Sequence, residues 1–153
     1  MDGAALDGLM AIALREAALA AAHADVPIGA VVGGPDGKVL AQRHNEREVA
    51  RDPTAHAEIL ALRDAAQALG SWRLEGCALV VTLEPCPMCA GAAINARIAT
   101  IAFGASDPKA GATGSLYNLA VDPRLNHECI VIDGIRADES ARLLQEFFAE
   151  RRG

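Results

Sequence analysis

Apolar residues near the start of the chain recur at intervals of three and four positions, the spacing of one face of a helix. The residues with this spacing are Leu6, Leu9, Met10, Ala13, Ala17 and Ala20. The pattern predicts an amphipathic first helix that ends near His23.

Short apolar segments rich in β-branched residues predict five strands further along the chain. They cover residues 26–32, 38–43, 77–83, 98–103 and 129–132. Residues 33–37 read Gly-Gly-Pro-Asp-Gly, a turn sequence that joins the first two strands as a hairpin. A glycine-rich loop is expected over residues 104–114, after the fourth strand.

Three more helices are expected between and after these strands. Asp52-Pro53-Thr54 is typical of a helix cap, and the helix that it opens is expected to run to about Leu69. Pro85 is expected to open the next helix, because proline fits a first helical turn. Residues 139–152 predict a final helix. Its apolar side carries Leu143, Leu144, Phe147 and Phe148.

The order of these elements predicts an α/β fold, because strands that alternate with helices form a sheet with helices on its faces. We expect residues 1–153 to form one domain, long enough to bury a core without disulfides. Hydrophobic residues make up 52% of the chain and aromatic residues 3%, so the core must be aliphatic.

The composition also favours a cytoplasmic protein without a membrane segment. No apolar run reaches the roughly 18 residues of a membrane span, and Arg15 and Glu16 interrupt the first apolar stretch, unlike a secretory signal. Four cysteines are too few for a disulfide scaffold, and two of them form Cys86-x-x-Cys89. That spacing favours a metal site.

The net charge of −6 argues against a protein that coats RNA non-specifically, because that mode of binding depends on neutralising phosphates. A local basic edge is still compatible with an acidic chain. The residues that would form it are Arg97, Lys109, Arg151 and Arg152. The alternative is that these are ordinary solvated charges.

His56, Cys86 and Cys89 supply three ligands of the type that zinc prefers. Three ligands leave one coordination position for water or substrate, which is typical of a catalytic zinc. Cys86 and Cys89 are three residues apart near the start of a helix. Their sulfurs therefore share a face, and the helix N-terminus favours the thiolate form.

Glu58 lies close to the ligand His56 and is expected to act as the proton shuttle. Two thiolates offset the charge of Zn²⁺ and weaken its effect on bound water, so a separate base is needed. We expect Glu58 to take a proton from water, and later to protonate the amino group that leaves the ring as ammonia.

The alternative is a closed structural zinc site in which Cys77, Cys129 or His127 is the fourth ligand. Cys77 and Cys129 lie in apolar strand patterns, where a buried thiol is common. His23 at a helix end, and His44 and His127 in loops, are expected to be surface or capping residues. The sequence therefore favours the open, catalytic site.

The His-Ala-Glu and Pro-Cys-x-x-Cys strings resemble the signature of the zinc-dependent nucleobase deaminases. Longer strings, residues 52–59, 81–92 and 114–116, resemble bacterial tRNA adenosine deaminases, and the likeness runs from about residue 6 to residue 152. The resemblance implies a three-layer α/β/α cytidine deaminase-like fold with a mixed five-stranded sheet. It also implies one Zn²⁺ per subunit and conversion of the wobble adenosine of a tRNA anticodon to inosine, with tRNA-Arg as the expected substrate.

The resemblance also implies residues that contact the RNA and a homodimer. Asn45 is expected to bind the flipped nucleotide, and Ile28 lies in the segment that borders the base pocket. A loop residue pair and two residues of the last helix are expected to grip the anticodon stem-loop: Asp107, Lys109, Phe148 and Arg152. Residues 89–94 are apolar around the whole helix, which suits either the core or a subunit interface.

The motifs specify hydrolytic removal of a ring amino group but not the base. A free-base or nucleoside deaminase of the guanine or cytosine type is therefore an alternative, and the acidic charge and small size suit it. A non-catalytic zinc interaction module is disfavoured by the open ligand position and by Glu58.

Overall fold

A computed structural model describes residues 1–152 of the chain. Five strands form one sheet in the order β2-β1-β3-β4-β5. Their bounds are Gly29–Gly33 (β1), Val39–His44 (β2), Ala78–Leu83 (β3), Thr100–Ala105 (β4) and Ile130–Ile132 (β5). β1 is antiparallel to β2 and β3, whereas β3, β4 and β5 run parallel. The mixed five-stranded sheet is confirmed.

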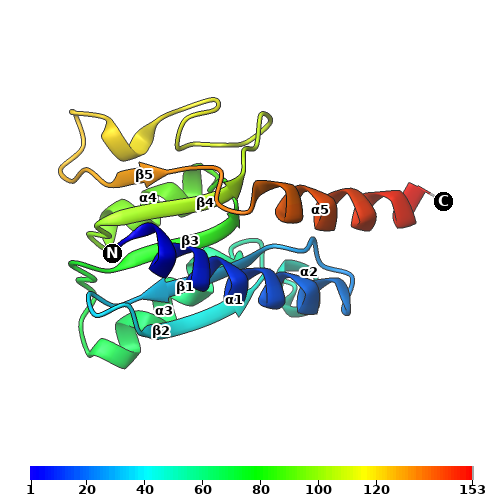
Figure 1. Ribbon diagram of the computed structural model, residues 1–153, viewed down its shortest axis with the longest axis horizontal. Coiled ribbons are helices and arrows are strands. Elements are labelled where there is room, and N and C mark those ends of the chain that lie inside the picture. The colour runs from blue at the N-terminus through cyan, green and yellow to red at the C-terminus, as the bar shows by residue number, and fades with distance from the viewer. Residues whose placement is uncertain (153) are drawn as a thin grey trace.

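Helices cover both faces of this sheet, because the strand side chains alternate between two apolar clusters. Val31 and Val80 pack with α1 (Gly3–Ala21), while Val32 and Val81 pack with the helices on the opposite face. Those helices are α3 (Ala57–Leu69) and α4 (Pro87–Asn95). The last helix, α5 (Ala137–Arg152), shares the face of α1 and projects past the sheet (Figure 1). The predicted three-layer α/β/α arrangement is confirmed.

Gly29 allows α1 to lie directly against the sheet. A Cβ atom at Gly29 would lie 1.9 Å from the carbonyl oxygen of Ala13, a backbone atom that cannot turn aside. Ala13 and Ala17 on the facing side of α1 are fully buried, and their small side chains permit the same close approach. The small side chains at this contact therefore fix β1 close against α1.

Two helix starts differ from the sequence prediction. α3 begins at Ala57 with His56 as its N-cap, and the carboxylate of Asp52 instead accepts hydrogen bonds from the amide and hydroxyl of Thr54, both at 2.8 Å. α4 begins at Pro87, with Cys86 as its N-cap, so Pro85 does not open the helix. Both metal-ligand segments therefore stand at helix N-termini in extended backbone.

A short helix, α2 (Arg47–Ala50), was missed by the sequence prediction. The carboxylate of the buried Asp25 accepts hydrogen bonds from the amides of Glu48 (2.6 Å) and Val49 (3.2 Å), which stabilises the start of this helix. A 3₁₀ turn, Leu119–Val121, completes the secondary structure. Within residues 1–152, no helix combines the length and apolar character needed to cross a membrane.

Candidate active site

The three predicted metal ligands meet at the N-termini of α3 and α4. His56 Nδ1 lies 3.6 Å from Cys86 Sγ and 3.4 Å from Cys89 Sγ. All three ligand atoms lie within 4.8 Å of one another. In a tetrahedral zinc site with ordinary bond lengths, a nitrogen and a sulfur ligand are about 3.6 Å apart. The spacing and chemistry of this group therefore fit zinc.

The residues considered as a fourth ligand lie elsewhere. Cys77 is buried and its thiol donates a hydrogen bond to the carbonyl of Glu75 at 3.8 Å. Cys129 is buried as well, and Nε2 of His127 contacts the Ile98 carbonyl at 2.7 Å. In the part of the chain that the structure describes, the gathered metal-ligand group has three members. This geometry favours an open site over a closed one.

The pKa values of the two cysteine thiols are shifted in opposite directions. The hydrogen bond from the Cys89 thiol, helped by the one from His56, lowers the pKa of Cys86 to about 4. The same contact with Cys86, together with burial, raises the pKa of Cys89. One thiolate thus stands at the N-cap of α4 with a proton held beside it. Metal binding to such a pair releases the remaining thiol proton.

Glu58 lies in the first turn of α3 and is 4% exposed. Burial raises the pKa of its carboxyl to about 7, and the nearby negative charge of Cys86 acts in the same direction. A carboxyl with a pKa near 7 can both accept and donate a proton at neutral pH. This property matches the shuttle role predicted from the sequence.

A cavity of about 440 Å³ opens in front of His56 and Glu58. It is enclosed by the segment before β1, by the end of β3, by α2 and α3, by the loop after β4 and by α5. Its lining includes Ile28, Asn45, His56, Glu58, Asp107, Lys109 and Phe148. Most residues selected from the sequence therefore share one cavity. Arg152 is exposed at the end of α5 and does not line it.

Asn45 is held in a fixed orientation at the wall of this cavity. Its side-chain amide donates a hydrogen bond to the Val26 carbonyl (3.2 Å), and its side-chain oxygen accepts one from the amide of Arg47 (3.1 Å). The residue is 5% exposed. An amide group has two donor hydrogens and two acceptor lone pairs, so each end of Asn45 keeps hydrogen-bonding capacity for a ligand.

Glu84 was missed by the sequence analysis, although it holds the loop that supplies Asp107 and Lys109. Its buried carboxylate accepts hydrogen bonds from the amides of Asp107 (3.0 Å), Thr113 (3.1 Å) and Ser115 (3.0 Å), and from the Ser115 hydroxyl. Burial alone would raise the pKa of Glu84, but these donors together lower it. The sequence signal that could have revealed this role is the position of Glu84, a charged residue directly after the apolar strand β3.

Arg47 and Leu144 also line the cavity without having been predicted to do so. Arg47 lies on α2, and the absence of that helix from the sequence prediction hid its position. Leu144 was assigned to the apolar side of the last helix, where its neighbour Phe147 is in fact buried and Phe148 turns to the cavity.

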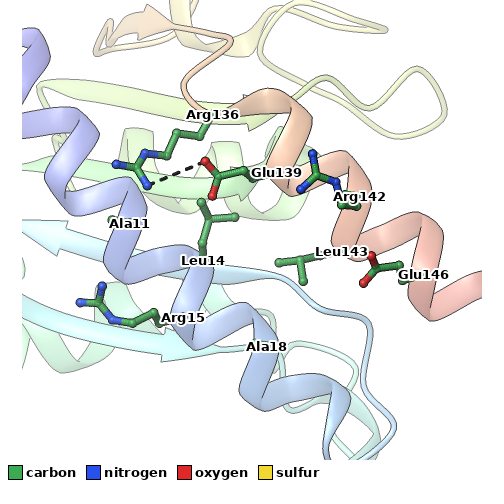
Figure 2. A pocket seen from close by; sticks show the side chains of 9 residues that line it. All are labelled: Ala11, Leu14, Arg15, Ala18, Arg136, Glu139, Arg142, Leu143 and Glu146. Atoms are coloured by element: carbon green, nitrogen blue, oxygen red, sulfur yellow. Dashed lines mark ion pairs between the residues drawn. The ribbon is translucent and has the colours of Figure 1, made fainter.

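A second cavity, of about 410 Å³, lies between α1 and α5 (Figure 2). Arg15, Arg136 and Arg142 project around it, and Arg136 pairs with Glu139 at 3.8 Å. The side chains that line it include no histidine or cysteine. The groups that could perform deamination are therefore gathered in the cavity beside His56.

Comparison with known proteins places the chain in a family. The model of the MafB19-like deaminases matches residues 6–152. A tRNA-specific adenosine deaminase of Bacillus subtilis is 47% identical over 140 residues, which cover 92% of this chain and 86% of that protein. The chain belongs to the MafB19-like deaminases and, within them, to the family of bacterial tRNA-specific adenosine deaminases.

Other matches include a longer protein and two solved structures. A tRNA(Ile)-lysidine synthase of Deinococcus deserti is 48% identical over 147 residues, 96% of this chain but only 27% of that longer protein. A tRNA:A34 deaminase, studied for A-to-I editing at the wobble position, superposes with a TM-score of 0.86 at 45% identity over 90% of this chain and 99% of that one. A guanine deaminase of Nitrosomonas europaea superposes with a TM-score of 0.78 at 26% identity, over 94% and 84% of the two chains.

Proposed function

We propose that this protein hydrolytically deaminates adenosine to inosine at the wobble position of a tRNA anticodon, with tRNA-Arg as the first substrate to test. The observation that carries the proposal is the metal-ligand group of His56, Cys86 and Cys89 beside a cavity that His56 and Glu58 line. The similarity to tRNA-specific adenosine deaminases supports adenosine in tRNA as the substrate.

His56 Nδ1 and the sulfurs of Cys86 and Cys89 would hold one zinc ion per subunit. When bound, zinc supplies a Lewis acid that makes water a better nucleophile. The protein groups present fit this ion in type, number and spacing.

Glu58 carries the protons of the reaction. Its carboxylate takes a proton from the attacking water as the water oxygen bonds to C6 of adenine, and delivers that proton to N1 of the ring. Glu58 then takes the remaining proton from the oxygen now bonded to C6 and gives it to the amino group. The amino group leaves as ammonia when the C6–N bond breaks. Burial of Glu58, which raises the pKa of its carboxyl, favours both transfers near neutral pH.

The cavity wall would orient a base that has been turned out of its stack. The hydrogen-bonding groups of Asn45 are fixed, and the apolar side chains of Ile28 and Leu83 limit water access to the ring. Phe148 is 46% exposed at the cavity edge, where an unstacked base can lie against its ring. Asp107 and Lys109 would contact the neighbouring nucleotides.

Positive charge near the cavity suits an RNA backbone despite the net charge of −6. Lys109 and Arg47 line the cavity, and Arg151 and Arg152 lie on the last turn of α5. Phosphate contacts by a few such residues bind RNA locally without a globally basic protein. We assign the tRNA anticodon stem-loop to this edge.

We also propose a homodimer that uses the outer side of α4. Cys89, Ala90, Ala93 and Ile94 of that helix are buried within the chain. Met88 is 36% exposed and the nearby Trp72 is 57% exposed. A shallow cavity of about 290 Å³ runs between Trp72 and Ala92. An exposed tryptophan beside small residues suits a second copy of the chain.

Guanine deamination is the second candidate, because a guanine deaminase shares this fold over 94% of the chain. The deciding experiment compares three substrates under the same conditions: a tRNA-Arg anticodon stem-loop with adenosine at the wobble position, free guanine and free cytidine. Inosine in the RNA, detected as a changed base on sequencing, supports the proposal. Turnover of free guanine without inosine in the RNA would replace it with the second candidate, and turnover of free cytidine alone would contradict both.

A further inference from the structure

A pair of histidines lies outside the catalytic cavity in an arrangement that their isolated sequence positions did not indicate. His44 is the last residue of β2, and His23 lies just beyond α1. Their Nε2 atoms are 3.1 Å apart, and their ring centroids are 5.2 Å apart at an interplanar angle of 37°. The rings therefore meet edge to edge, with one nitrogen of each facing the other.

The other nitrogen of each ring faces a carboxylate. His23 Nδ1 lies 2.8 Å from Asp25 Oδ2, and His44 Nδ1 lies 2.9 Å from Glu16 Oε1. A carboxylate accepts hydrogen bonds, so each ring keeps a proton on Nδ1 to donate. When both rings are neutral, that tautomer leaves a lone pair on each Nε2, and the two lone pairs face one another.

We propose that His23 and His44 bind a divalent transition-metal ion through Nε2, at a second site separate from the catalytic one. Two facing lone pairs repel unless a cation lies between them. With metal–nitrogen bonds of about 2.0 to 2.1 Å, an Nε2 separation of 3.1 Å gives an N–metal–N angle of about 100°. That angle suits two adjacent ligands in a tetrahedral or octahedral site, after a small rotation that directs both rings at one point.

The carboxylates support a metal site in a recognisable way. Histidines that bind metals usually donate their other ring N–H to a carboxylate or carbonyl, which fixes the ring and makes the ligand nitrogen more basic. Both histidines have this arrangement, with two different carboxylates. Asp25 is also held by two amides of α2, and Glu16 also accepts a hydrogen bond from the Gln42 side chain at 3.1 Å.

The position of the pair allows metal to enter and water to complete the coordination. The side chains of His23 and His44 are 26% and 20% exposed, whereas those of Asp25 and Glu16 are 0% and 12% exposed. The ligands thus reach solvent, while Asp25 is fully buried and Glu16 is less exposed than the ring that it contacts. Imidazole ligands select zinc, nickel or copper over magnesium or calcium.

Ni²⁺ is the probe for the test, used on tag-free protein whose catalytic site is first loaded with zinc. Isothermal titration at pH 7.5 is expected to show one equivalent of bound Ni²⁺ per chain beyond the resident zinc. His23→Gln and His44→Gln should each weaken that binding at least 10-fold, and Glu16→Gln should weaken it about 10-fold by loss of the supporting carboxylate. Zinc content and circular dichroism verify that each variant is folded.

His127→Gln is the matched control, because His127 is partly buried and its nearest polar contact is the Ile98 carbonyl. This variant should bind Ni²⁺ as the unaltered protein does. Absence of a second equivalent, or undiminished binding in His23→Gln, would overturn the proposal. A nitrogen-15 spectrum with a proton shared between the two Nε2 atoms, together with no Ni²⁺ binding, would show that a proton alone occupies the pair. The readout is independent of deamination.

Discussion

Glu58 and Glu84 are both buried glutamates next to the start of a helix, but their surroundings act on them in opposite directions. Burial dominates at Glu58 and raises the pKa to about 7. At Glu84, three backbone amides and a hydroxyl outweigh burial and lower the pKa. Burial alone therefore does not decide whether a carboxyl carries protons or holds structure; the number of hydrogen-bond donors facing it does.

The largest effect should come from removing the proton carrier. Glu58→Gln is expected to lower the rate of inosine formation at least about 10³-fold, because an amide cannot accept the proton of water. Zinc content should stay at one per chain, since Glu58 is not a ligand. The rate of inosine formation is measured by sequencing RNA from reactions quenched at successive times, and the zinc content is measured by metal analysis. Retained activity with zinc present would remove Glu58 from the mechanism.

Glu84→Gln should act on stability and binding rather than on the chemical step. The side-chain NH₂ group of the new glutamine would face backbone N–H groups that now donate to the Glu84 carboxylate. Because two donors cannot pair, the free energy of unfolding should fall by about 1 to 3 kcal/mol. The loop with Asp107 and Lys109 loses its anchor, so KM for the RNA should rise more than kcat falls. Urea unfolding and steady-state kinetics test this. A fall in kcat with no change in KM would contradict this expectation and would indicate that Glu84 acts on the chemical step, as Glu58 does.

Gly111→Ala should disturb the same anchor by crowding it. A Cβ at Gly111 would lie 2.3 Å from Cδ of Glu84, whose carboxylate is held by several donors and cannot move freely. Overpacking of this kind costs about 1 to 3 kcal/mol. Gly8→Ala is the control, because Gly8 lies in α1 with no atom near the added carbon. An equal effect of the two substitutions on the unfolding midpoint would contradict the expected crowding at Glu84.

The opposite pKa shifts predict opposite pH dependences of stability. The contribution of Glu84, whose pKa is lowered, is complete above the ordinary glutamate value of 4.5 and is lost as the pH falls through the folded-state pKa. Glu58, whose pKa is raised, favours the fold in its protonated form. Its contribution is complete below 4.5 and is lost as the pH rises through about 7.

The effect of pH on stability is the smallest of the predicted effects, and it is measured as a difference between variants. Unfolding free energies of zinc-depleted protein are compared with those of Glu58→Gln and Glu84→Gln from about pH 3 to about pH 8. The unaltered protein should lose stability relative to Glu58→Gln as the pH rises, and lose its advantage over Glu84→Gln as the pH falls. Slopes of the same sign would show that the two carboxyls do not differ as the structure indicates.

The sequence was enough to predict those site residues that lie close to one another along the chain. His56 and Glu58 stand two residues apart, and Cys86 and Cys89 three apart, so their chemistry could be predicted without coordinates. Short apolar segments rich in β-branched residues likewise predicted the strands of the sheet, because the central strands β1, β3 and β4 face an apolar layer on both sides. These predictions depend on neighbours in the chain.

The features that were missed depend on distant partners. The cap of α2 comes from Asp25, 23 positions before the amide of Glu48, so no local pattern marks that helix. Glu84 binds amides 23 to 31 positions later. His44 was expected in a loop and His23 as a surface or capping residue, but they meet across 21 positions at the end of a strand. Only the folded chain brings these groups together.

Asp25 offers protein engineers a way to alter the cavity beside His56 from outside it. Its buried carboxylate holds the first amides of α2, and α2 carries Arg47 into the cavity, yet Asp25 itself does not line that cavity. Substitutions at Asp25 are therefore expected to shift one wall of this cavity without altering any of its lining residues. Libraries that seek acceptance of a different nucleobase should vary this position together with the pocket lining.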